Sequence, residues 1–127
     1  LDAMNSEVSL IITGGFRVSS DMAKAIALGA DAIAVASAAM MAIGCQQYRM
    51  CGTGRCPVGI TAQDPALRAR LDVAQSAQRL ANYFTVCNEE LKTFARITGN
   101  NDLHGLNIKN LFTTNSEISE HTNIKHA

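Results

Sequence analysis

The chain has 127 residues, with 11 Lys and Arg against 11 Asp and Glu, and its formal net charge is zero. This balance gives no electrostatic reason to expect nucleic acid or an anionic membrane as a partner. The longest apolar tract, "AIAVASAAMMAIGC" from Ala32, is shorter than the ~20 residues of a membrane span. We expect a cytoplasmic protein, in which clustered cysteines serve metal or redox chemistry more often than disulfides.

The first predicted element is a strand, Val8 to Thr13, whose sequence "VSLIIT" has little polar alternation. This pattern is typical of a parallel strand that is buried on both faces. A helix is predicted next over "DMAKAIALG", with Ser19 or Ser20 as its N-cap and Gly29 as its C′ residue.

A second apolar strand is predicted from Asp31 to Ala36. Strand, helix and strand form a βαβ unit, which implies a parallel pair with a right-handed crossover. Two parallel strands cannot bury both faces or pair their outer edges. We therefore expect the chain to be the C-terminal piece of a larger α/β domain.

The carboxyl ends of these strands carry a candidate phosphate site. Gly14 and Gly15 follow the first strand, and a helix is predicted from Ser37 to Gly44, directly after the second. Glycine lets backbone N–H groups approach a ligand, and a helix N-terminus favours an anion. In a (β/α)8 barrel, the loops after strands seven and eight frequently form such a site. The alternative is a tight turn whose small residues serve packing.

Three cysteines follow at once, Cys45, Cys51 and Cys56, and Pro57 comes after the last of them. Thiolates are the usual ligands of iron–sulfur clusters, and cysteine followed by proline also closes the bacterial ferredoxin motif. Zinc is the main alternative, but a structural zinc site takes four ligands, and this segment offers three thiols and no histidine. Free structural cysteines are the remaining interpretation, which a polar, glycine-rich loop disfavours.

The remainder of the chain is predicted to be helical with a polar terminus. Asp64 can cap a helix that has Pro65 at its first position. A long helix is predicted from Val73 to Gly99, and Cys87 lies in the middle of its apolar stripe. Cys87 is therefore predicted to pack in a core and not to bind metal. A short helical stretch is expected near Leu106 to Leu111.

Taken together, "ITGGFRVSSDMAKAIALGADAIAVASAAMMAIGC" and "CGTGRCPVGITAQDP" closely resemble the FMN-binding domain of the glutamate synthase large subunit and glutamate synthase-related proteins. The most discriminating part is the spacing C-x5-C-x4-C-P-V-G directly behind the second βα unit. Other phosphate-binding barrels, such as the IMP dehydrogenases, share the "GG-R…ALGADA" pattern but lack this cysteine loop.

The resemblance implies an α/β fold, the C-terminal part of a (β/α)8 TIM barrel. Residues 1–44 would form its last two βα units, residues 45–63 a cluster loop and residues 64–127 a C-terminal helical segment, all within one incomplete domain. The cofactors implied are FMN and a [3Fe–4S] cluster. By the same resemblance the FMN phosphate would contact Gly14, Gly15, Ser37 and Ala38, and the iron ligands would be Cys45, Cys51 and Cys56.

The activity implied is an oxidoreductase reaction, the reductive synthesis of glutamate from 2-oxoglutarate and glutamine-derived ammonia. The electron donor would be a protein or subunit, either NADPH-linked or a ferredoxin. The family's substrate-binding residues lie in earlier strands, so no catalytic residue is assigned, and Lys24 is not promoted to that role. The alternative is an electron-transfer or structural metal module without this activity. For the metal, a [4Fe–4S] cluster with an upstream ligand is the closest competitor and zinc is third.

Overall fold

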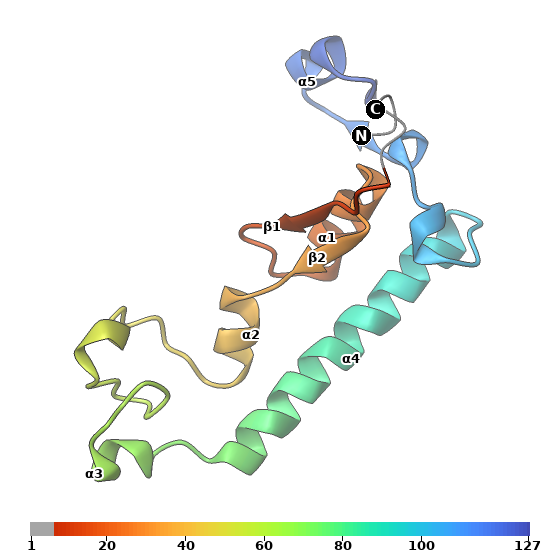
Figure 1. The fold of residues 1–127 in the computed structure, drawn as a ribbon. Helices are drawn as coiled ribbons and strands as arrows, with labels where there is room; N and C mark the ends of the chain where they lie inside the picture. The colour runs from red at the N-terminus through yellow and green to blue at the C-terminus, as the bar shows by residue number, and fades with distance from the viewer. Residues whose placement is uncertain (1–6) are drawn as a thin grey trace. The chain divides into compact units, whose positions relative to one another are not determined.

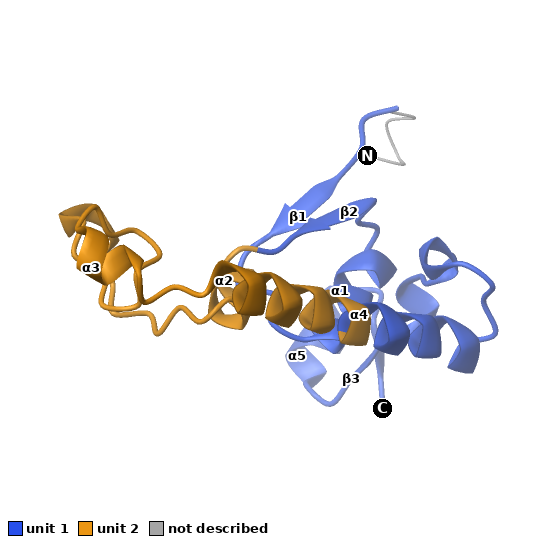
Figure 2. Ribbon diagram, turned by 90° about the horizontal axis from the view of Figure 1, so that it is seen from below, with its two compact units in different colours: residues 1–35, 87–127 blue, residues 36–86 orange. Residues whose placement is uncertain are grey.

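The computed structural model describes residues 7–127, which divide into two compact units (Figures 1 and 2). The first unit contains the chain up to residue 35 together with residues 87–127, and the second contains residues 36–86. The long helix α4, Val73–Ile97, begins in the second unit and ends in the first. Each unit is therefore described by itself.

The first unit is built on the predicted βαβ unit. Strands β1, Ile11–Thr13, and β2, Ala32–Ala34, pair in parallel, with Ile12 opposite Ile33, and helix α1, Ser19–Ala27, connects them. The parallel pairing is confirmed, but both strands are shorter than predicted. In the described chain this sheet has only two strands, so the pairing has no further neighbour to extend it. The larger barrel stays a prediction.

The ends of α1 show one wrong and one confirmed prediction. The N-cap residue is Val18, and no side chain caps the helix. Ser19 lies inside the first turn instead, where its hydroxyl donates to the Glu90 carboxylate at 2.5 Å. The C-terminal end is as predicted, because Gly29 has φ +100° and its N–H donates to the carbonyl oxygen of Ile26 at 2.8 Å.

A small apolar core forms where α1 meets the end of α4 and the segment that follows it. Its buried residues are Ala23, Ala25, Ile26, Ala27, Ala30 and Leu106. Ile12 and Ile33 pack against this cluster from the two strands, and Leu91 and Phe94 do so from α4. The small alanine side chains on α1 let the helix backbone lie close to its neighbours. The strand residues Ile12 and Ile33 therefore pack against α1 on one face of the short sheet.

The second unit contains α2, Ser37–Ala42, the 3₁₀ helix η2, Cys51–Thr53, and α3, Pro65–Arg68. The predicted cap at α3 is confirmed, because the Asp64 carboxylate accepts from the N–H of Ala66 at 2.7 Å and Pro65 is the first helical residue. A similar contact opens α4. The carboxylate of Asp72 accepts there from the N–H of Gln75 at 2.9 Å.

The apolar stripe of α4 is only partly buried. The helix itself is confirmed within two residues of the predicted end. Cys87 is 5% exposed, whereas Val73 is 72% and Phe84 is 40% exposed. The prediction that Cys87 packs in an interior is confirmed, while the first half of the stripe stays open in the described chain.

The C-terminal segment holds more regular structure than predicted. After the 3₁₀ helices η3, Leu103–Gly105, and η4, Ile108–Asn110, come β3, Phe112–Thr113, α5, Ser116–His121, and β4, Lys125–His126. Strands β3 and β4 pair in parallel. The expected short helical stretch corresponds to η4, and the small second sheet was missed. Within residues 7–127, no helix has both the length and the hydropathy to cross a membrane.

The side chain of His104 joins η3 to the segment that leads into β2. Its Nε2 lies 3.0 Å from the carbonyl oxygen of Asp31, and its Nδ1 lies 3.2 Å from the carboxylate of Asp102. Both partners are acceptors, so only the doubly protonated ring can donate to both. These contacts, the Asp31 carbonyl first, raise the pKa of His104 above its ordinary value.

This contact predicts a pH-dependent stability. A raised folded-state pKa means that the stabilisation is fully present below the unfolded value of about 6.5 and is lost as the pH rises through the folded value. We expect the thermal midpoint of the intact protein to fall over that window, and His104→Gln to remove this component. His121→Gln, on the exposed α5 helix, is the matched control and should keep the wild-type profile. An unchanged profile in His104→Gln would contradict the assignment.

Candidate metal and flavin site

The three clustered cysteines lie in the loop between α2 and α3, entirely within the second unit. All three line one cavity of about 20 Å³, which is room for about one water molecule. Cys56 is buried, Cys45 is partly buried and Cys51 is exposed. The loop therefore turns all three toward a shared interior but is closed tightly around it, and a cluster would need this loop to widen.

The backbone after Cys56 curls around its sulfur. The N–H of Gly59 donates to the carbonyl oxygen of Cys56 at 3.0 Å, and Gly59 has φ +87°. The turn directs the backbone N–H of Thr61, with those of Val58 and Ile60, at the Cys56 thiol. These donors, Thr61 first, lower the pKa of the thiol to about 7. Cys56 is thereby prepared to act as a thiolate, the form that binds metal.

The other side of the loop is bent by two residues in the left-handed region. Gln47 has φ +57° and Arg49 has φ +58°, although neither is glycine. The N–H of Gln47 donates to the sulfur of Cys45 at 3.4 Å. Non-glycine residues held in this conformation store strain, which is common at binding sites. The bend therefore supports a loop that is shaped for a ligand.

The three thiols of the loop do not meet the geometry of a single metal ion. Within residues 7–127, no group of three or more Cys, His, Asp or Glu side chains converges closely enough to hold one metal ion. Around tetrahedral zinc the Zn–S distance of ~2.3 Å brings the sulfurs to about 4 Å from one another. In an iron–sulfur cluster each cysteine binds a different iron, so the thiols stand further apart than around one ion.

Cys87 is placed differently from the other three thiols. It lies on α4, is 5% exposed and belongs to the first unit. It is not among the residues that line the cavity of the cysteine loop. Its position agrees with the interpretation of Cys87 as a packing residue.

The residues predicted to bind phosphate are divided between the two units, with Gly14 and Gly15 in the first and Ser37 and Ala38 in the second. Gly14 and Gly15 follow β1 with φ +121° and +74°, and a Cβ atom at either would meet no atom within 4 Å. Ser37 and Ala38 are the first residues of α2, Ser37 exposed and Ala38 buried. The parallel register sets Thr13 opposite Ala34, so both strands end at the same edge. N–H groups in a first helical turn have no acceptor within their own helix.

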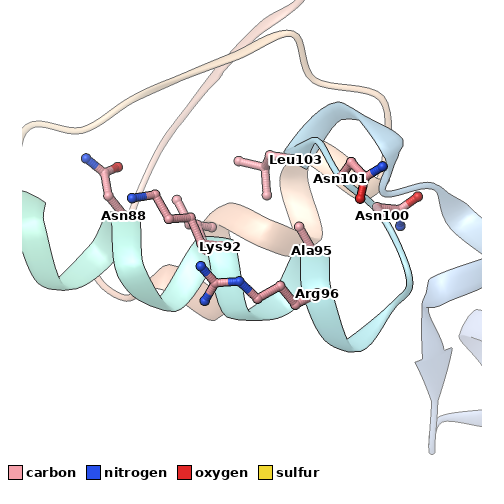
Figure 3. Close-up of a pocket in the computed structure, with 8 residues that line it drawn as sticks. Asn88, Lys92, Ala95, Arg96, Asn100, Asn101 and Leu103 are labelled. Atoms are coloured by element: carbon pink, nitrogen blue, oxygen red, sulfur yellow. The ribbon is translucent and has the colours of Figure 1, made fainter.

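A larger cavity, of about 540 Å³, lies along the C-terminal half of α4 (Figure 3). Its polar lining includes Lys92, Arg96 and the amide side chains of Asn88, Asn100 and Asn101. Lys92 pairs with Glu89 at 2.7 Å. None of the residues predicted to bind flavin or metal lines this cavity, so we do not place the chemistry there.

The sequence interpretation missed the N–H donors to the thiols. They belong to Gln47 beside Cys45 and to residues 58–61 beside Cys56. Backbone donors have no side-chain signature, and the only available signal was Gly59, three residues after Cys56. A glycine at that spacing permits the turn that aims the following N–H groups backwards.

The fold and this site define a class of α/β protein in which a cysteine loop follows a βαβ unit in the sequence. A family model described as a conserved region in glutamate synthase matches residues 2–101. The chain therefore belongs to the glutamate synthase family. No solved structure matches it.

Named relatives agree with this assignment. A glutamate synthase large subunit-like protein of Rhizobium meliloti is 42% identical over 91% of this chain and 30% of its own length. An archaeal glutamate synthase of Methanocaldococcus jannaschii, whose name specifies NADPH, is 42% identical over 83% of this chain and 21% of its own length. A chloroplastic ferredoxin-dependent glutamate synthase of Oryza sativa is 40% identical over 72% of this chain. The chain thus spans less than a third of these relatives.

Proposed function

We propose that the chain is part of a glutamate synthase-type oxidoreductase that uses FMN and an iron–sulfur cluster. The reaction is the reductive synthesis of glutamate from 2-oxoglutarate and glutamine-derived ammonia. The observation that carries the proposal is the cysteine loop, because three thiols line one interior in a chain of this family. An electron-transfer or structural metal module related to the family is the second candidate, since the chain spans only part of its relatives.

The metal ligands in this proposal are Cys45, Cys51 and Cys56, and the cluster is of the [3Fe–4S] type. The buried Cys56 sulfur is surrounded by N–H donors, and the Gln47 N–H donates to Cys45. These donors stabilise negative charge on the thiolates and hold their orientation. The loop between α2 and α3 thus binds, orients and partly shields the metal group.

The FMN phosphate is assigned to Gly14, Gly15, Ser37 and Ala38. Glycine N–H groups can approach a phosphate without a side chain in the way, and the start of α2 supplies N–H groups of favourable polarity. When bound, FMN would supply hydride chemistry and the cluster would pass electrons singly. In this proposal residues 1–44 bind the flavin, residues 45–63 bind the cluster and residues 64–127 form a helical segment. The flavin segment and the cluster segment are therefore consecutive in the sequence.

The substitution Gly15→Asp tests the assignment of the FMN phosphate to Gly15 directly. A carboxylate beside a phosphate dianion is repelled, so we expect FMN retention by the intact protein to fall at least about tenfold. Gly15→Asn is the isosteric neutral variant and should lose much less. Gly99→Asp is a matched control, because Gly99 has φ +75° and equally open surroundings. Flavin content after gel filtration is the measurement, and equal retention in Gly15→Asp and Gly15→Asn would refute the assignment.

The proposed function is tested on the intact protein, purified anaerobically. Flavin and metal content, electron paramagnetic resonance, and glutamate formation from 2-oxoglutarate and glutamine would be measured with NADPH or reduced ferredoxin as the electron source. We expect FMN, iron and glutamate formation together. Iron and flavin without glutamate formation under either donor would favour the electron-transfer module, and stoichiometric zinc without iron would favour the structural module.

A further inference from the structure

The first of the three loop cysteines follows a Schellman motif at the end of α2. Gly44, with φ +108°, is the C′ residue, and its N–H donates to the carbonyl oxygen of Met41 at 3.0 Å. The N–H of Cys45 donates to the carbonyl oxygen of Met40, also at 3.0 Å. These two hydrogen bonds define the motif. The backbone of Cys45 is therefore tied to the last turn of α2.

A serine on α4 completes this helix end. The carbonyl oxygen of Ile43, the C-cap residue of α2, has no acceptor role within its own helix. The hydroxyl of Ser76 donates to it at 3.1 Å, across 33 residues of sequence. A serine inside a helix commonly bonds a carbonyl of its own preceding turn. Ser76, only 9% exposed, instead joins α4 to the end of α2.

Arg79 gives α4 a second contact with the same bend. It lies one helical turn after Ser76, and a Cβ atom at Gly44 would be 3.8 Å from its Nη1 atom. The Asp72 carboxylate fixes the first turn of α4 by accepting from the N–H of Gln75. All of these residues belong to the second unit. Two side chains of one capped helix thus contact the residues directly before Cys45.

We propose that the start of α4 holds Cys45 in its position in the cysteine loop, through the Ser76 hydroxyl and, more weakly, through Arg79. Both are positioning residues, because they act on the bend before Cys45 and touch neither metal nor substrate. The inference rests on the proposed function only for the role of Cys45 as an iron ligand. Cys51 and Cys56 come later in the loop, so loss of the contact should affect Cys45 selectively.

The direct measurement is the alkylation rate of each thiol in the intact protein, after a chelator has removed the metal anaerobically. Iodoacetamide is the probe, and peptide mass spectrometry reads the three cysteines separately. Cys45 is partly buried, so its rate depends on local opening of the chain. Since one hydrogen bond is lost, we expect Ser76→Ala to accelerate alkylation of Cys45 about fivefold. Cys51 and Cys56 should keep their wild-type rates.

Three further variants separate the hydroxyl from the fold. Ser76→Thr keeps the hydroxyl and should react at the wild-type rate. Thr85→Ala is the matched control, because it removes a hydroxyl from an exposed position of α4 within the second unit. Arg79→Ala truncates an exposed side chain, which a fold tolerates, and should accelerate Cys45 about twofold.

A wild-type Cys45 rate in Ser76→Ala would overturn the proposal. Equal acceleration at all three cysteines would do so too, because that is the result of a general loosening of the second unit. Ser76→Thr reacting as fast as Ser76→Ala would show that the hydroxyl is not the cause. If Ser76→Ala does not fold, Arg79→Ala decides, and a wild-type Cys45 rate in that variant rejects the contact.

Iron loss gives a second readout in the metal-loaded protein. Side chains that support a metal ligand contribute to metal retention, so Ser76→Ala should lose iron to a chelator about fivefold faster than the wild type. Absence of iron from the wild-type protein would refute the proposed function. The alkylation rates would still decide whether α4 holds Cys45, so the two failures are distinguishable.

Discussion

Serine at any one of Cys45, Cys51 or Cys56 is expected to abolish the electron paramagnetic resonance signal of the oxidised cluster in the intact protein. The three irons of [3Fe–4S]⁺ couple to a half-integer spin and give a signal near g ~2. Each thiolate holds a different iron, so loss of any one leaves a site that a hydroxyl replaces poorly. Iron content per chain should fall together with the signal.

Cys87→Ser is the control for this series. Cys87 is buried on α4 and lines no part of the cysteine loop cavity. A buried hydroxyl in its place should lower the thermal midpoint, because it needs a hydrogen-bond partner in an apolar setting. The signal should persist. Loss of the cluster in Cys87→Ser, with retention in any of the three loop variants, would overturn the ligand assignment.

The parts of the fold that sequence predicted well depend on local signals. The βαβ unit, the Asp64 cap with Pro65 and the 25 residues of α4 all have patterns that their neighbours suffice to interpret. Ser19 failed as a cap because the carboxylate of Glu90, distant in the sequence, binds its hydroxyl. The second sheet was missed because β3 and β4 have two residues each, too few for any alternation to show.

For the candidate site, too, sequence predicted the local feature and missed the part that depends on the folded chain. Cysteine spacing pointed to Cys45, Cys51 and Cys56, and the structure gathers the three around one cavity. The environment of these thiols was not predictable, because it comes from main-chain N–H groups, which every residue type except proline carries.

Gly59→Ala is expected to disrupt the half of the loop that surrounds Cys56. An alanine methyl group at this position would overlap the carbonyl oxygen of Leu67 and lie 3.2 Å from the N atom of Leu71. These are backbone atoms of α3 and of the turn after it, so they cannot move aside as a flexible side chain would. The φ of +87° adds strain for any residue with a Cβ atom. Together we expect a local cost of about 3 kcal/mol or more.

Two other glycines of the loop separate these causes. Gly54→Ala has the unfavourable φ, +68°, but its nearest neighbour would be the Gln63 side chain at 3.7 Å, so strain alone predicts about 1–2 kcal/mol. Gly52→Ala meets no atom within 4 Å and has no positive φ, and its effect should stay within about 0.5 kcal/mol.

Amide hydrogen exchange over residues 56–71 of the intact protein measures these local costs. Because about 1.4 kcal/mol corresponds to tenfold, exchange should accelerate roughly 100-fold in Gly59→Ala, about tenfold in Gly54→Ala and scarcely in Gly52→Ala. Iron content should fall in the same order, since the turn at Gly59 aims the N–H donors at Cys56. Wild-type exchange and iron content in Gly59→Ala would show that the turn does not support the metal site.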